Sequence, residues 1–139
     1  MFVAINPADA LPIYRQIMRE VIDAIAGGRL GGGDKLPSHR ELSETLVVAP
    51  LTVKKAYDEL EGLGYIETVR GRGTFVCARP PKLMRATHTA QLHDAARALL
   101  SQAYLSGLGF GDVLTLLRSA DRQLVDGPTM PRRKTAARS

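Results

Sequence analysis

A change in hydrophobic periodicity after Gly64 constrains the fold of this chain more than any other feature of its sequence. Before that residue, apolar side chains recur at the spacing of an amphipathic helix in three segments. These segments are residues 11–26, about nine residues from Ser38, and residues 50–63. After it, two runs of β-forming residues, 65–69 and 74–77, flank a short loop that contains glycine, which is typical of a hairpin. The sequence therefore predicts three helices followed by a two-stranded hairpin.

Residues with capping chemistry mark where these helices begin and end. Asp9 can cap the first helix, and Gly27 can end it. Ser38 and Glu41 have the S-x-x-E spacing of a capping box, in which each side chain pairs with a backbone N–H that the helix leaves unbonded. Gly64 suits the left-handed conformation that often follows the last helical turn.

The third predicted helix has one face for a core and another for solvent. On a helical wheel of about 100° per residue, Val53, Ala56 and Leu60 lie on one side, whereas Leu51 and Lys55 lie opposite. Too few residues separate this helix from the second one for anything but a tight turn. Three helices with such a turn, followed by a hairpin, describe an α+β fold, the winged helix-turn-helix.

The third helix and the hairpin carry the residue types that DNA contact requires. A helix in the major groove contacts base edges through short polar or cationic side chains in its first turns, where this chain has Thr52, Lys54 and Lys55. A hairpin wing comes close to the duplex where glycine removes side-chain bulk, and it needs cations for phosphate or the minor groove. The Arg-Gly-Arg-Gly run at residues 70–73 supplies both.

Four spaced motifs lie in order within residues 11–76. They are Pro12-Ile13-Tyr14-x-Gln16-Ile17, Gly33-Asp34-x-Leu36-Pro37-Ser38-x-Arg40-Glu41-Leu42, Thr52-Val53-x-x-Ala56-Tyr57-x-x-Leu60-Glu61 and Gly71-x-Gly73-Thr74-Phe75-Val76. Together they closely resemble the GntR family of bacterial transcription regulators, and their order is far more specific than any one motif. The short extension that follows resembles the YtrA subfamily, in which the C-terminal part is a dimerisation element.

Carried over position by position, the resemblance implies five positions of DNA contact. These are Arg40 at the start of the second helix, Thr52 and Lys54 in the third, and Arg70 and the backbone of Gly71 in the wing. Lys55 and Arg72 are further candidates from their charge and placement. The alternative is that these are ordinary solvated side chains, with Arg40 pairing to Glu44 one helical turn away.

The turn before Thr52 departs from the family pattern. The family usually has Ser, Asn, Thr or Arg there, whereas this chain has Ala49, Pro50 and Leu51. Ala49 cannot cap a helix with its side chain, which costs about 1 kcal/mol, and the fixed φ of Pro50 partly offsets this loss. Leu51 donates no hydrogen bond to a base, although it can touch a thymine methyl. The operator of this chain therefore does not follow from the operators of the family.

The organisation along the chain is expected to have four parts. These are a DNA-binding domain over 1–78, a linker over 79–88, a two-helix element over 89–126 with helices at 89–106 and 111–124, and a basic, disordered tail over 127–139. An isolated helix pair with apolar stripes rarely buries them alone, so we expect a homodimer through residues 89–126. Packing of the pair on the winged domain of its own chain is the alternative.

Charge is distributed unevenly over these parts. The chain has a formal net charge of +5, but residues 1–78 carry 9 basic and 10 acidic side chains, and residues 79–139 carry 10 basic and 4 acidic ones. Global attraction to DNA therefore does not identify the DNA-binding face, and the signal is local. The basic linker and tail either add non-specific phosphate attraction or serve as a solubilising extension.

Other function classes find little support in the sequence. The single cysteine, Cys77, excludes an internal disulfide, and no apolar run reaches the length of a membrane span, so a cytoplasmic protein is expected. His88 and His93 are five residues apart and face different sides of a helix, which disfavours joint metal ligation. We therefore expect no enzyme activity, metal or cofactor.

The resulting hypothesis is a homodimeric repressor that binds an inverted-repeat, double-stranded DNA operator, with no membrane contact. A winged-helix module that binds protein instead of DNA is the alternative. A small-molecule effector stays an open question, since only a dimer groove or the interdomain hinge offers it room.

Overall fold

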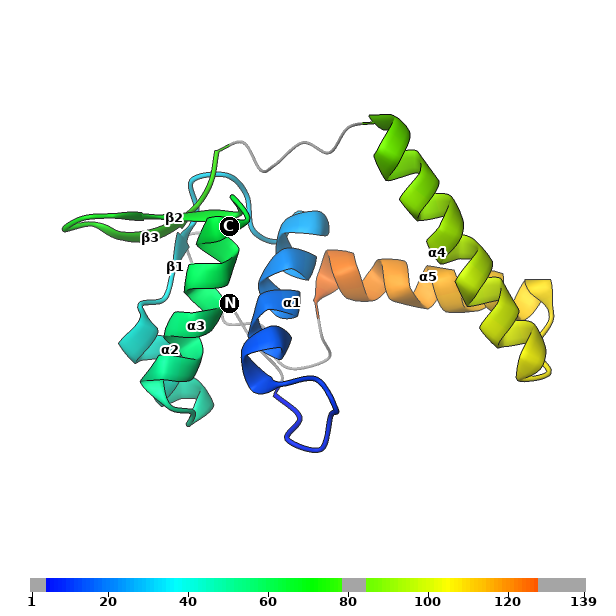
Figure 1. Ribbon diagram of the computed structural model, residues 1–139, viewed down its shortest axis with the longest axis horizontal. Coiled ribbons are helices and arrows are strands. Elements are labelled where there is room, and N and C mark those ends of the chain that lie inside the picture. Colours follow the sequence, from blue (N-terminus) through cyan, green and yellow to red (C-terminus); the bar gives the residue numbers. More distant parts are fainter. Residues whose placement is uncertain (1–4, 79–84, 128–139) are drawn as a thin grey trace. The chain divides into compact units, whose positions relative to one another are not determined.

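The chain forms five helices and three short strands within the part that the computed structural model describes, residues 5–78 and 85–127 (Figure 1). Side chains are described throughout these ranges except at residues 85–88. The chain divides into two compact units, one carrying the elements from α1 to β3 and the other holding α4 and most of α5. Each unit is taken by itself below. Most of the predicted linker and nearly all of the predicted basic tail lie outside the described residues.

Helix α1 spans Ile13–Ala26 and ends at Gly27, as predicted. Its expected start was wrong, because the residue at the N-cap is Pro12 and not Asp9. Pro12 has extended backbone angles (φ −56°, ψ 151°), so the helix begins only after it. The Asp9 carboxylate instead accepts a hydrogen bond from the Leu11 N–H, at 2.9 Å, in the turn that leads into the helix.

Helix α2 spans His39–Leu46 and begins with the predicted capping box. The Ser38 hydroxyl accepts from the Glu41 N–H at 3.1 Å, and the Glu41 carboxylate accepts from the Ser38 N–H at 2.9 Å. Helix α3 spans Pro50–Gly62, and its N-cap residue Ala49 makes no side-chain capping hydrogen bond. Gly64 has the predicted left-handed conformation, with φ 89°.

The sheet contains a strand that the sequence did not predict. Strands β2 (Ile66–Val69) and β3 (Gly73–Val76) form the expected hairpin, whereas β1 (Lys35–Leu36) has only two residues. All pairing is antiparallel, in the order β1-β3-β2, with Lys35 opposite Phe75. A two-residue strand has no periodicity to detect, and its partner lies about forty residues further along the chain.

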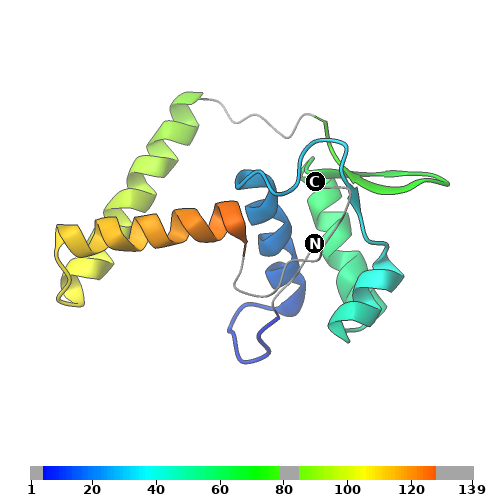
Figure 2. The same cartoon turned by 180° about the vertical axis from the view of Figure 1, so that it is seen from behind.

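The core of this unit joins the three helices to the sheet. Its buried apolar side chains come from every element of the unit: Ile17, Val21, Leu36, Leu42, Val53, Ala56, Tyr57, Leu60, Ile66 and Val76. Helix α3 packs against both α1 and α2, which is visible from two sides (Figures 1 and 2). The face of α3 that the helical wheel assigned to the core is the buried one, so the opposite face is directed to solvent.

Val47, in the tight turn between α2 and α3, has a backbone conformation that is unfavourable for a β-branched residue. Its φ of 56° is left-handed, and its side chain is 88% exposed. The left-handed region costs an L residue about 1–2 kcal/mol, whereas glycine enters it without penalty.

Replacing Val47 with glycine is therefore expected to raise the free energy of unfolding by about 1 kcal/mol. Chemical denaturation monitored by circular dichroism would measure the change. Val48→Gly is the matched control, because Val48 packs against the core and its loss must destabilise the domain. A decrease for Val47→Gly would contradict the strain argument.

The second unit contains helices longer than predicted. Helix α4 spans Arg85–Leu105 and α5 spans Phe110–Asp126. The prediction that this helix begins at residue 89 was wrong, because residues 85–88 already belong to α4. No glycine or proline interrupts the chain between Arg85 and Thr89, so nothing stops the helix from extending there. Gly107, with φ 86°, follows the end of α4.

Candidate nucleic-acid interface

The exposed face of α3 carries the first group of predicted site residues. Lys54 and Lys55 are exposed and Thr52 is half-buried at the edge of the helix. The first seven residues of the helix, 50–56, contain these two lysines and no acidic residue. Because the helix also lacks a capping side chain, the positive end of its dipole and its cations are directed at the same region of solvent.

The two neighbouring lysines have different surroundings. The Lys54 ammonium lies 2.7 Å from the Asp58 carboxylate, one helical turn further along α3, and both side chains are more than half exposed. The Lys55 ammonium lies over the aromatic ring of Tyr14 in α1, 4.6 Å from its centroid, which is a cation–π contact. An exposed ion pair is worth well under about 1 kcal/mol, so an anion can replace Asp58 at Lys54 at little cost.

Tyr57 holds the start of α2 against α3. Its hydroxyl donates a 2.7 Å hydrogen bond to the Pro37 carbonyl, and its ring meets that of His39 edge to face at 5.0 Å. Burial, with a smaller contribution from the Glu41 charge, raises the pKa of Tyr57, so the hydroxyl keeps its proton and its donor role into more alkaline solution than an ordinary tyrosine does. This contact determines where the first turn of α2, with its predicted site residue Arg40, lies relative to α3.

Arg40 is exposed and is not paired with Glu44. The ion pairs found within residues 5–78 join Arg19 to Asp9 and Lys54 to Asp58. The structural alternative proposed for Arg40, an i, i+4 pair, is therefore wrong in this conformation. Its guanidinium is available for a phosphate or a base.

The tip of the β2–β3 hairpin carries the remaining predicted residues. Arg70, Gly71 and Arg72 are all exposed, and the Arg72 N–H closes the turn by donating to the Val69 carbonyl at 2.9 Å. Gly71 has φ 78°, a conformation that favours glycine. The predicted hairpin tip, with its two exposed arginines and its glycine, is thus present in the structure.

Lys35 is a cation at this hairpin that the sequence reasoning missed. It is exposed on β1, and its Cε lies 2.9 Å from the point where a β-carbon on Gly73 would stand. Because Gly73 has no side chain, the Lys35 side chain can lie against the backbone of the wing at this position. The sequence could not place Lys35 at the wing, because its position depends on the pairing of β1 with β3, which no local sequence pattern indicates.

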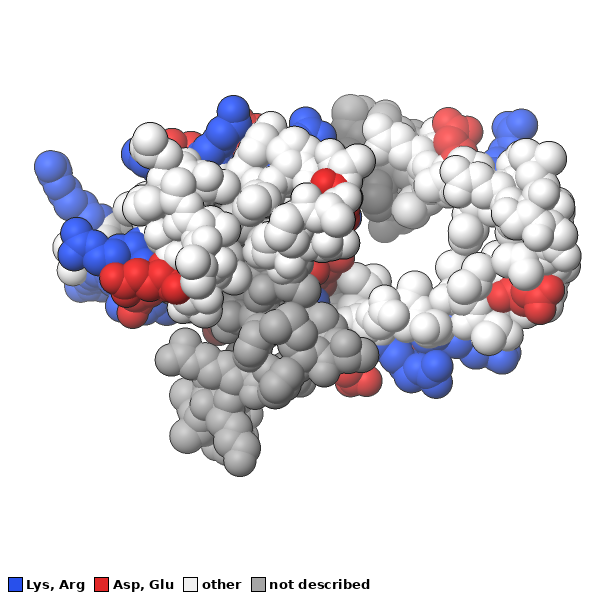
Figure 3. Space-filling view, turned by 90° about the horizontal axis from the view of Figure 1, so that it is seen from below, with Lys and Arg blue, Asp and Glu red and all other residues white. Residues whose placement is uncertain are grey.

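The wing also has acidic neighbours. The Glu61 carboxylate accepts a 3.3 Å hydrogen bond from the Thr68 N–H, and Glu67 lies opposite Phe75 in the sheet. Figure 3 shows Lys and Arg side chains gathered at the end of this unit from which the wing projects, with acidic side chains among them. The interface is thus a set of local cations and not a uniformly positive surface.

Cys77, which follows β3, has no sign of an activated thiol. Partial burial and the nearby carboxylates of Glu67 and Glu61 raise its pKa, which keeps it protonated and a poor nucleophile. Within the described residues, no cluster of three or more His, Cys, Asp or Glu is arranged to hold a metal ion. The described helices also include none that is long and apolar enough to cross a membrane.

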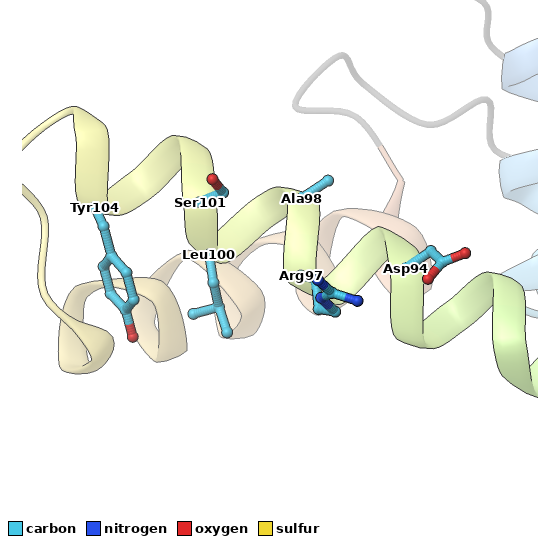
Figure 4. Close-up of a pocket in the computed structure, with 6 residues that line it drawn as sticks. All are labelled: Asp94, Arg97, Ala98, Leu100, Ser101 and Tyr104. Atoms are coloured by element: carbon cyan, nitrogen blue, oxygen red, sulfur yellow. The ribbon is translucent and has the colours of Figure 1, made fainter.

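The second unit exposes much of its apolar surface. Among its described residues, Ala103 and Val113 are buried, whereas eight large apolar side chains are exposed: Leu92, Tyr104, Leu105, Leu108, Phe110, Leu114, Leu116 and Leu117. Residues of α4 alone line a shallow groove: Asp94, Arg97, Ala98, Leu100, Ser101 and Tyr104 (Figure 4).

Three helices, a tight turn before α3 and a glycine-containing cationic wing define a winged helix-turn-helix protein that binds DNA. Residues 13–76 match the model of the bacterial regulatory proteins of the gntR family. The chain belongs to the GntR family and is a DNA-binding transcription regulator.

The similarity to individual family members extends beyond the winged domain. The chain is 36% identical to the HTH-type transcriptional repressor YtrA of Bacillus subtilis (strain 168), over 76% of this chain and 82% of that one. It resembles the crystal structure of a transcriptional antiterminator from Listeria monocytogenes EGD-e, with a TM-score of 0.74 and 30% identity, over 95% of this chain and 98% of that one. It also resembles YtrA from Sulfolobus acidocaldarius, a GntR-family transcription factor, with a TM-score of 0.54 and 38% identity, over 68% of this chain and 97% of that one.

Proposed function

We propose that this protein is a homodimeric repressor that binds an inverted-repeat operator and blocks transcription by occupying it. The observation that carries the proposal is that α3 buries one face in the core and exposes two lysines on the opposite face. Of these, Lys54 is paired with the exposed Asp58 on the same helix, an ion pair that DNA can replace. The alternative role, docking on a protein, finds less support, because Leu51 is the one large apolar side chain among the described exposed residues of α3.

In this proposal α3 lies in the major groove. Lys54 leaves Asp58 for a base edge or a phosphate, and Thr52 offers a short hydroxyl near the helix start. Arg40 contacts the backbone from the first turn of α2, which Tyr57 holds against α3. Lys55 lies over the ring of Tyr14, so we assign it to the long-range electrostatic attraction of DNA and not to a direct contact with a base or phosphate.

The wing is assigned to the neighbouring minor groove or its phosphates. Arg70 and Arg72 extend from the tip, and Gly71 presents backbone without a side chain. Lys35 adds a cation along the same wing. These contacts position the protein on the duplex, whereas α3 distinguishes sequences.

The dimer is assigned to residues 89–126. The apolar side chains that α4 and α5 leave exposed need a partner, and a second copy of the same helices supplies one of matching chemistry. A two-fold dimer presents two α3 helices to two half-sites of opposite orientation, which is why the operator is expected to be an inverted repeat. We propose no enzyme activity, since the protein's relatives are regulators.

Sedimentation velocity with and without operator DNA tests this proposal. The operator would first be selected from random duplexes with the purified protein. We expect a dimer at micromolar concentration, one dimer per duplex, and half-sites about one helical turn apart, or a multiple of it. Leu117→Glu, which puts a charge on the exposed apolar surface of α5, should shift the protein to a monomer.

Thr115→Glu is the matched control, because Thr115 is an exposed polar residue of the same helix. It should leave the dimer intact. A wild-type monomer both free and on DNA would refute the dimer, and failure to select any sequence would refute specific binding.

A further inference from the structure

Leu51 is a large apolar side chain that the fold leaves mostly exposed. It is the second residue of α3 and is 76% exposed, whereas the buried apolar residues of this helix begin with Val53 on the opposite face. Its neighbours on the exposed side are Lys54, Lys55 and Asp58. The turn just before it also exposes the apolar residues Val47, Ala49 and Pro50, but on α3 itself Leu51 is the one large apolar side chain of the exposed face within the described residues.

The chemistry around Leu51 matches the floor of a DNA major groove. Two lysines within the next turn suit the phosphates that border the groove. The floor itself presents hydrogen-bonding base edges and one apolar group, the C5-methyl of thymine. An exposed apolar side chain flanked by cations therefore complements that methyl better than it complements water.

We propose that Leu51 is a specificity-determining residue that packs against a thymine C5-methyl in each operator half-site. This inference rests on the proposed placement of α3 in the major groove. It assigns an A·T pair to a defined position and lets the protein distinguish thymine from cytosine there through the methyl group alone.

Deoxyuridine tests this contact because it lacks only the C5-methyl of thymine. Each thymine of the selected operator would be replaced in turn, in both half-sites, and the Kd measured by fluorescence anisotropy. Burying one methyl favours binding by a factor of roughly 4, so loss of two symmetric methyls should weaken wild-type binding roughly 15-fold at one position. Leu51→Ala should bind the thymine operator more weakly and show no further loss with deoxyuridine at that position.

Leu63→Ala is the matched control, since Leu63 is an exposed leucine at the other end of α3. It should keep the full response to deoxyuridine. An effect of the methyl on DNA stiffness would persist in Leu51→Ala, and that result would overturn the inference, as would a wild-type protein that responds at no thymine. Failure to select any operator would instead refute sequence-specific binding, on which the inference depends.

Discussion

Replacing Tyr57 with alanine is expected to lower the free energy of unfolding by about 3–5 kcal/mol, which is a large part of the stability of a domain this small. The side chain is buried between α2 and α3, so its loss leaves a cavity in the core. It also leaves the Pro37 carbonyl without the hydroxyl that now donates to it at 2.7 Å. Urea denaturation of the purified protein would measure the change.

Tyr57→Phe separates the hydroxyl from the ring. We expect it to cost about 1–2 kcal/mol, because the ring still fills the core and only the hydrogen bond is lost. The pKa of Tyr57 is raised in the fold, so its contribution is intact below the ordinary pKa of tyrosine, 10.0, and is lost as the pH rises above that value. The difference between wild type and Tyr57→Phe should therefore shrink in alkaline solution, and a difference that grew there would contradict the assignment.

Removing both wing arginines, Arg70→Ala with Arg72→Ala, is expected to weaken operator binding about 10- to 100-fold at low salt. Each phosphate contact contributes about 0.9 to the slope of log K against log salt concentration, so the slope should fall by about 2. Fluorescence anisotropy across a salt series would measure both quantities. Both arginines are exposed at the tip and neither packs in the core, so the fold should not change.

The matched control removes the same charge from the second unit, with Arg118→Ala and Arg122→Ala, which are exposed on α5. It should keep the wild-type slope. If the wing variant kept that slope as well, the arginines would be solvated charges and the wing would have no role in binding.

Local sequence chemistry was sufficient for much of the domain. The capping box at Ser38 and Glu41 was predictable because its two bonds join residues three apart. The wing tip was predictable because glycine spacing and strand propensity are local as well. The start of α1 was not, since Asp9 and Pro12 both suit a helix start and the competition between them depends on the turn that precedes the helix.

The sequence alone established that three helices and a hairpin exist, which face of α3 enters the core, and which motifs define the family. The elements and the buried face depend on residues within about a dozen positions of one another, where backbone preference and hydrophobic period act directly, and the family motifs are legible from their order along residues 11–76. The tertiary structure decided the rest: β1 pairs with β3, Lys35 lies along the wing, Tyr57 joins α3 to the start of α2, and Lys55 lies over Tyr14 while Lys54 meets Asp58. All but the last of these join residues far apart in the chain, and core packing determines which of them meet. The Lys54–Asp58 pair is within one turn, but its side-chain rotamers are set only once the helix is formed.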